Sequence, residues 1–148
     1  MLKGIPKILS PEILKILSEM GHGDELVIAD ANFPSASFGN KVVRADGCTG
    51  EEMLKAVISL LPLDQYEAKN MFLMDLTGND KEKPLIWNRY KEIVAMEEKD
   101  VRIAWLTRYD FYERTKQAYA VLATGEETSY ANVILKKGVI FQNKEKAE

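Results

Sequence analysis

The residues best suited to chemistry lie in one short stretch near the beginning of the chain. Residues 20–32 have the sequence MGHGDELVIADAN, in which His22, the only histidine of the protein, stands between two glycines. Imidazole can give and take protons near neutral pH, so His22 is a candidate general acid or base. A second interpretation stays open, because a histidine just after a helix also interacts favourably with the carbonyl end of that helix.

Two polar residues, Asp30 and Asn32, follow the apolar run 26–29. This run predicts a buried strand, and in an open α/β sheet the residues just past the carboxyl end of a strand face the ligand crevice. We therefore expect Asp30 and Asn32 to line a binding crevice. His22 precedes the same strand, and six residues of strand span about 20 Å. Either the strand is short, or His22 and Asp30 meet across a contact between two subunits.

A helix before this strand is expected to position His22. Ser10 is its predicted N-cap and Pro11 its first residue. Apolar residues at positions 13, 14, 17 and 20 recur with helical spacing. Gly21 is predicted to end the helix in the left-handed conformation, which would set the direction of His22.

The rest of the chain alternates between helical and strand patterns. Thr49 and Glu52 form a predicted capping box. This alternation predicts an α/β fold with a largely parallel sheet, in which the last two strands could run antiparallel. The predicted strands are 41–44, 71–74, 101–106, 118–123 and 133–136, and the predicted helices are 49–61, 84–98 and 110–116.

Two further polar residues follow predicted strands, as Asp30 does. Arg108 can donate two hydrogen bonds to sugar hydroxyls or hold a carboxylate. Asp75 could line the same crevice or face solvent. The loop 33–40 carries two aromatic residues, which form either a lip of the binding site or a contact with the core or a second subunit.

Composition narrows the class of protein. The chain has 148 residues and is 46% hydrophobic, which suits one globular domain. Its net charge of -3 and the lack of a basic block argue against nucleic acid as a partner. The single cysteine, with no signal peptide or long apolar segment in the sequence, predicts a cytoplasmic protein without membrane contact. Zinc motifs, G-x-G-x-x-G and the P-loop are missing, so no metal is implied and no nucleotide cofactor is indicated, although a carboxylate site for a hard cation stays open.

Six short motifs occur along the chain in a fixed order. They are EMGHGDE at 19–25, DANFP at 30–34, RADG at 44–47, FYER at 111–114, TGE at 124–126 and YANVILKKG at 130–138. Together they resemble the L-fucose mutarotase family, which is related to D-ribose pyranase. The resemblance covers residues 1–140 and implies one sugar mutarotase domain with a three-layer α/β/α fold. Residues 141–148 would then form a charged tail, disordered from Lys144 onward.

The resemblance also implies an activity and a site. The family interconverts the α and β anomers of a free sugar without a cofactor, and its subunits form ring-shaped decamers with sites near subunit contacts. By this resemblance His22 is the acid/base, Asp30 and Arg108 bind the sugar, and the segment Tyr130, Ala131 and Asn132 completes the site. Asn32 departs from the family, since some fucose-type members have a histidine there, which affects a secondary contact.

The residues leave other functions open. A D-ribose pyranase-type activity on another free aldose needs the same groups, because the sequence does not identify the sugar. A non-catalytic sugar-binding protein would have no use for a histidine between two glycines. An aldose–ketose isomerase moves a carbon-bound proton or hydride, so it would incorporate solvent deuterium or require a metal. For a mutarotase, the separation of His22 from Asp30 predicts an active site shared between subunits.

Overall fold

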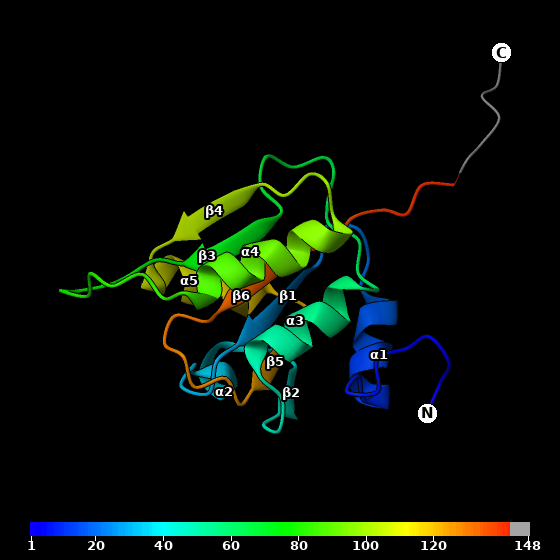
Figure 1. The fold of residues 1–148 in the computed structure, drawn as a ribbon, viewed down its shortest axis with the longest axis horizontal. Coiled ribbons are helices and arrows are strands. Elements are labelled where there is room, and N and C mark those ends of the chain that lie inside the picture. The colour runs from blue at the N-terminus through cyan, green and yellow to red at the C-terminus, as the bar shows by residue number, and fades with distance from the viewer. Residues whose placement is uncertain (143–148) are drawn as a thin grey trace, which may run out of the picture.

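Six strands form one sheet with helices on both faces in the computed structural model, which describes residues 1–142 (Figure 1). The predicted disorder from Lys144 onward lies outside these residues. In chain order the elements are α1 (Pro11–Glu19), β1 (Glu25–Ala29), α2 (Ser35–Phe38), β2 (Val42–Ala45), α3 (Gly50–Ile58), β3 (Met71–Met74), α4 (Ile86–Glu97), β4 (Ile103–Leu106), α5 (Arg108–Gln117), β5 (Ala120–Thr124) and β6 (Val133–Lys136).

The sheet has the strand order β2-β5-β1-β6-β3-β4. β6 runs antiparallel to both of its neighbours, β1 and β3, whereas every other pairing is parallel. The last two strands therefore run in opposite directions, as the sequence allowed, but they do not pair, because β1 lies between them. As a consequence, the start of β6 lies beside the carboxyl ends of β1 and β3.

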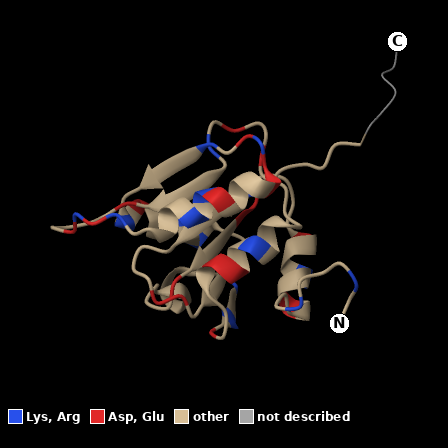
Figure 2. Ribbon diagram, viewed as in Figure 1, with Lys and Arg blue, Asp and Glu red and all other residues tan. Residues whose placement is uncertain are grey.

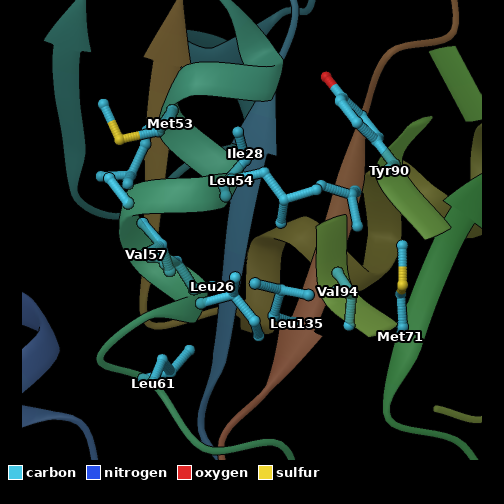
Figure 3. Close-up of a cluster of buried hydrophobic side chains, with 14 of the residues drawn as sticks. Leu26, Ile28, Met53, Leu54, Val57, Leu61, Met71, Tyr90, Val94 and Leu135 are labelled. Atoms are coloured by element: carbon cyan, nitrogen blue, oxygen red, sulfur yellow. The ribbon is translucent and has the colours of Figure 1, made fainter. Parts of the chain in front are cut away.

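The two faces of β1 belong to two separate cores. Leu26 and Ile28 pack into a large cluster with residues of α1, α3 and α4, while Val27 and Ala29 pack into a smaller cluster with Phe111 of α5. Figure 3 shows the large cluster, in which side chains of α3 and α4 lie against those of β1 and β6. Burial on both faces explains why β1 is a continuous apolar run, and it confirms the predicted three-layer α/β/α fold.

Charged residues are concentrated on the helices and loops, whereas β3 and β4 carry none (Figure 2). Among residues 1–142, no helix has both the length and the apolar composition needed to cross a bilayer.

The predicted helix starts are confirmed for α1 and α3. The Ser10 side chain accepts a hydrogen bond from Ile13 N–H, and Thr49 and Glu52 form a complete capping box. Each cap satisfies backbone N–H groups that the first turn of a helix leaves without an intrahelical partner.

Two details of the loop that carries His22 differ from the prediction. α1 ends at Glu19 with Met20 as its C-cap residue, and Gly21 does not have a positive φ. The left-handed conformation occurs instead at Gly23, with φ of 87°. The glycine whose left-handed conformation turns the chain near His22 therefore follows His22 and does not precede it.

Two further elements differ from the sequence prediction. α5 begins at Arg108 and not at residue 110, because the Thr107 side chain accepts a hydrogen bond from Asp110 N–H and caps the helix earlier. Arg108 thus lies in the first turn of a helix. The predicted loop 33–40 contains the one-turn helix α2, closed by the hydrogen bond from Gly39 N–H to Ser35 O.

We predict that Gly50→Ala destabilises the protein. Replacing glycine by alanine inside a helix ordinarily stabilises it by up to about 1 kcal/mol. At Gly50 a Cβ would lie 1.9 Å from the Oη of Tyr90, which is fully buried. Overpacking should therefore lower the free energy of unfolding by about 1–3 kcal/mol, as measured by urea denaturation. Gly47→Ala is the control, since a Cβ there meets nothing within 4 Å. An unchanged or higher stability of the Gly50 variant would contradict the prediction.

Candidate functional site

A cavity of about 260 Å³ opens at the sheet edge where β1 and β3 end and β6 begins. Pockets for drug-sized ligands typically measure about 300–1,000 Å³, so this one suits a small metabolite. Four of the predicted binding residues line it, namely Asp30, Arg108, Tyr130 and Asn132. Ala131 is buried behind them, and its carbonyl accepts a hydrogen bond from Tyr90 Oη at 3.2 Å.

Asp30 and Asn132, which both line the cavity, form two hydrogen bonds with each other. Asp30 N–H donates to Asn132 Oδ1 at 2.8 Å, and Asn132 Nδ2 donates to Asp30 Oδ2 at 3.0 Å. Asn32 N–H donates to the other carboxylate oxygen at 3.0 Å. Burial raises the pKa of Asp30, and the hydrogen bonds from Asn32 N–H and Asn132 Nδ2 oppose that shift. Because a carboxylate oxygen can accept two hydrogen bonds, each oxygen of Asp30 can still accept one from a ligand hydroxyl.

Aromatic rings of α5 fix the orientation of Arg108. Its Nε donates to Tyr112 Oη at 2.9 Å, and its guanidinium lies 5.5 Å from the ring centre of Tyr109 and 5.4 Å from that of Tyr112. Tyr112 is a site residue that the sequence alone did not reveal, although its spacing of four from Arg108 places both on one helix face.

The aromatic residues of the loop 33–40 pack against this tyrosine. The Phe33 ring lies edge-on to Tyr112 with 5.6 Å between centres, and the Phe38 ring stacks on it at 4.6 Å. Phe33 is buried in the smaller core and also lines the cavity. Both predictions for this loop, a contact with the core and a lip of the binding site, therefore apply to Phe33.

Tyr130 has an unusual backbone conformation at the rim of the cavity. Its φ is 60°, in the left-handed region that bulky residues rarely adopt. Trp87 Nε1 donates to its carbonyl at 2.9 Å, and Thr77 N–H donates to its Oη at 3.3 Å. Tyr130 Oη also donates to Asp80. These contacts hold the ring in one position, in spite of the backbone strain.

His22 lies far from this cavity within one chain. It belongs to the loop between α1 and β1, at the opposite end of β1 from Asp30, and five residues of strand alone span about 16 Å. Its Nε2 forms a hydrogen bond of 2.7 Å with Asp64 Oδ1, and its side chain is 45% exposed. The predicted interaction with the end of α1 is therefore not the main contact of His22, and the structure does not bring His22 and Asp30 together.

Asp64 is the residue near His22 that sequence analysis missed. Its side chain is completely buried, and burial acts to raise its pKa. Hydrogen bonds from Glu67 N–H and from His22 outweigh this effect and hold the pKa of Asp64 below its ordinary value. Since Nε2 of His22 is engaged by Asp64, Nδ1 is the ring nitrogen left to exchange a proton with a ligand.

Asp75 does not contribute to the cavity. It is exposed and lines a separate hollow of about 440 Å³ between α4 and β4, beside Trp87 and Trp105. Asn32 does line the site. Within residues 1–142, no cluster of three or more His, Cys, Asp or Glu side chains is arranged to hold a metal ion.

The doubly covered sheet and the small pocket lined by polar side chains at its edge define the class of this protein as α/β. The chain belongs to the RbsD / FucU transport protein family, whose sequence profile matches residues 3–140. It is 50% identical over 145 residues to fucose mutarotase from Mus musculus, covering 94% of this chain and 95% of the relative.

Two solved structures of similar proteins contain a sugar. The fucose mutarotase from Streptococcus pneumoniae, in complex with L-fucose, is 50% identical and has a TM-score of 0.91, covering 95% of this chain and all of that one. RbsD from Bacillus subtilis, complexed with D-ribose, is 26% identical with a TM-score of 0.70, over 95% of this chain and all of that one.

We predict that Asp64 makes stability depend on pH in the acid range. Its pKa in the folded state lies below the value of about 3.9 for an unfolded aspartate, so it contributes stability that is lost as the pH falls through the folded-state pKa. Asp64→Asn should be less stable than the wild type at pH 7. The difference should shrink between about pH 5 and pH 2.

Urea denaturation across this pH range measures the effect. The exposed Asp75→Asn is the control for loss of one carboxylate. A stability difference between Asp64→Asn and the wild type that stays constant with pH would contradict the assignment.

Proposed function

We propose that this protein is a fucose mutarotase, an isomerase that interconverts the α and β anomers of L-fucose. One observation carries the proposal. Over 95% of its length, the chain has 50% sequence identity to a fucose mutarotase whose structure holds L-fucose. The similarity to RbsD is weaker in both sequence and structure, so L-fucose is favoured over D-ribose.

The side chains suit this reaction. Mutarotation removes the proton of the anomeric hydroxyl, delivers a proton to the ring oxygen, and lets the open aldehyde rotate before it closes again. A positioned acid/base group contributes about 10²- to 10⁴-fold to such a step. His22 is proposed as this group, exchanging protons through Nδ1, while Asp30 accepts and Arg108 donates hydrogen bonds to the sugar hydroxyls.

We infer that each active site is shared between two copies of the chain. Within one chain β1 separates His22 from Asp30. The surface around His22 also carries exposed apolar side chains, with Tyr66 66%, Ile140 75% and Phe141 62% exposed. The ring of Tyr66 lies 5.1 Å from that of His22 and 6.4 Å from that of Phe141. An apolar surface of this kind around a polar group is typical of an interface.

This arrangement requires a homo-oligomer. We propose that the surface around His22 covers the cavity of a neighbouring copy, in the ring-shaped decamer implied by the family resemblance. A cytoplasmic location, expected from the single cysteine, fits a free monosaccharide as substrate.

We predict that His22→Ala lowers the rate of L-fucose anomer exchange by about 100-fold or more, because the acid/base group is lost. Saturation-transfer NMR between the two anomers measures the rate. The variant should remain folded, because His22 is half-exposed and water can replace its bond to Asp64.

His22→Gln provides the matched variant, since its amide can still donate to Asp64 but cannot exchange a proton near neutral pH. It should be as inactive as His22→Ala. Full activity of either variant would refute the acid/base role.

We predict that two inactive variants complement each other. His22→Ala chains retain the Tyr130 side of the site, and Tyr130→Ala chains retain His22. When subunits exchange, some interfaces pair an intact His22 with an intact cavity, so part of the exchange activity should return. Native mass spectrometry confirms the mixing. If well-mixed oligomers remain inactive, each site is built within one chain and the shared site is wrong.

A further inference from the structure

A four-residue turn forms two hydrogen bonds with the hydroxyl group of Tyr130. The turn spans Thr77 to Asp80 and is closed by a hydrogen bond of 3.3 Å from Asp80 N–H to Thr77 O. Gly78 occupies its second position with φ of 62°, which glycine adopts without strain. The turn belongs to the β3–α4 connection, which projects beyond the body of the domain in Figure 1 and carries charges of both signs in Figure 2.

The two ends of the turn bind the phenol oxygen in different ways. Thr77 N–H donates to Tyr130 Oη, and Tyr130 Oη donates its own proton to Asp80 Oδ2. A phenol has one proton to donate and oxygen lone pairs that accept. With its proton directed at Asp80, Tyr130 can interact with a ligand in the cavity only as an acceptor.

We propose that Asp80 is a positioning residue that fixes the proton of Tyr130, so that Tyr130 accepts a hydrogen bond from one hydroxyl group of the sugar. The inference rests on the proposed function for the identity of the ligand. Asp80 also lines the cavity, and in this proposal its effect on the ligand passes through Tyr130.

This orientation gives the cavity a fixed pattern of donors and acceptors. Asp30 and Tyr130 accept, and Arg108 donates. A sugar hydroxyl that donates to Tyr130 thus has its proton direction set before the reaction. Sites built to bind a particular hydroxyl discriminate strongly against ligands that lack it, because a buried partner is left unpaired. Asp80 would therefore determine which hydroxyl arrangement the cavity accepts.

A purely structural role does not explain Asp80. The residue is exposed and lies on a projecting loop, so its removal costs little packing. The backbone of Tyr130 is held independently by Trp87 Nε1. The hydrogen bond with Asp80 also raises the pKa of Tyr130, which keeps the phenol protonated, as this orientation requires.

The kinetic test compares Asp80→Ala with Asp80→Asn. Asp80→Ala removes the acceptor and frees the phenol proton, so KM for L-fucose should rise about tenfold while kcat changes less than about twofold. The amide oxygen of Asp80→Asn can still accept the proton, so its KM should stay within about threefold of the wild type. Glu82→Gln is the control on the same loop, because Glu82 has no hydrogen bond or ion pair to any of residues 1–142.

A double-variant cycle separates positioning from a general effect of the loop. Tyr130→Phe should raise KM about as much as Asp80→Ala, and combining the two should add nothing further, because Asp80 acts only through the phenol. Additive losses in the double variant, an Asp80→Ala enzyme with wild-type KM, or equal losses in Asp80→Ala and Asp80→Asn would each overturn the inference.

A ligand-free measurement keeps this inference distinct from the proposed function. In protein labelled at tyrosine Cζ, NMR titration should show a lower pKa for Tyr130 in Asp80→Ala than in the wild type, since the carboxylate that holds the proton is gone. Arg108, the other charged group that acts on Tyr130, has the opposite effect and is present in both proteins. Equal pKa values would refute the role of Asp80. If the wild type fails to exchange L-fucose anomers, the proposed function fails, while the titration still decides about Asp80.

Discussion

The cavity depends on the hydrogen bonds that Asp30 and Asn132 exchange. These residues are 102 positions apart in the sequence, and each lies at the end of a central strand. A buried carboxylate is costly unless its oxygens are hydrogen-bonded, so Asp30 requires this partner. The partner is available only because β6 is antiparallel and starts where β1 ends. The same reversal places Tyr130, two residues before Asn132, at the rim of the cavity.

Each chain thus carries two chemical groups at opposite ends of one strand. At one end a set of hydrogen-bonding side chains converges on a small cavity, and at the other end His22 is held by a buried carboxylate. The rigid strand fixes their separation. Under the proposed shared site, only assembly brings the two ends together, so a substitution that weakens the contact between subunits would lower activity without altering either group.

Local sequence signals predicted the local parts of this structure. The apolar run of β1 located Asp30 at a strand end, and the residue types at Ser10 and Thr49 located two helix starts, because caps involve residues three positions apart. The start of α5 was misplaced because Thr107 and Asp110 are both good capping residues, and only the path of the chain after β4 decides between them. Tyr130 and Asn132 were identified through family resemblance and not from a physical pattern.

The contacts that the sequence did not reveal are long-range. Asp64 meets His22 across 42 positions and Asp80 meets Tyr130 across 50, and nothing in the residues around either aspartate indicates its partner. The insertion of β6 between β1 and β3 was also missed, because strand patterns give burial but not strand order.

The position of β6 has a consequence for how the sheet assembles. Among the six strands of residues 1–142 it comes last in the sequence, yet it fills the centre of the sheet between β1 and β3. Without residues 133–136, the native strand pairings leave two separate sheets, β2-β5-β1 and β3-β4, each with an open apolar edge. Open edges of this kind pair readily with other chains. Insertion of residues 133–136 covers both edges at once, because β6 pairs with β1 on one side and with β3 on the other.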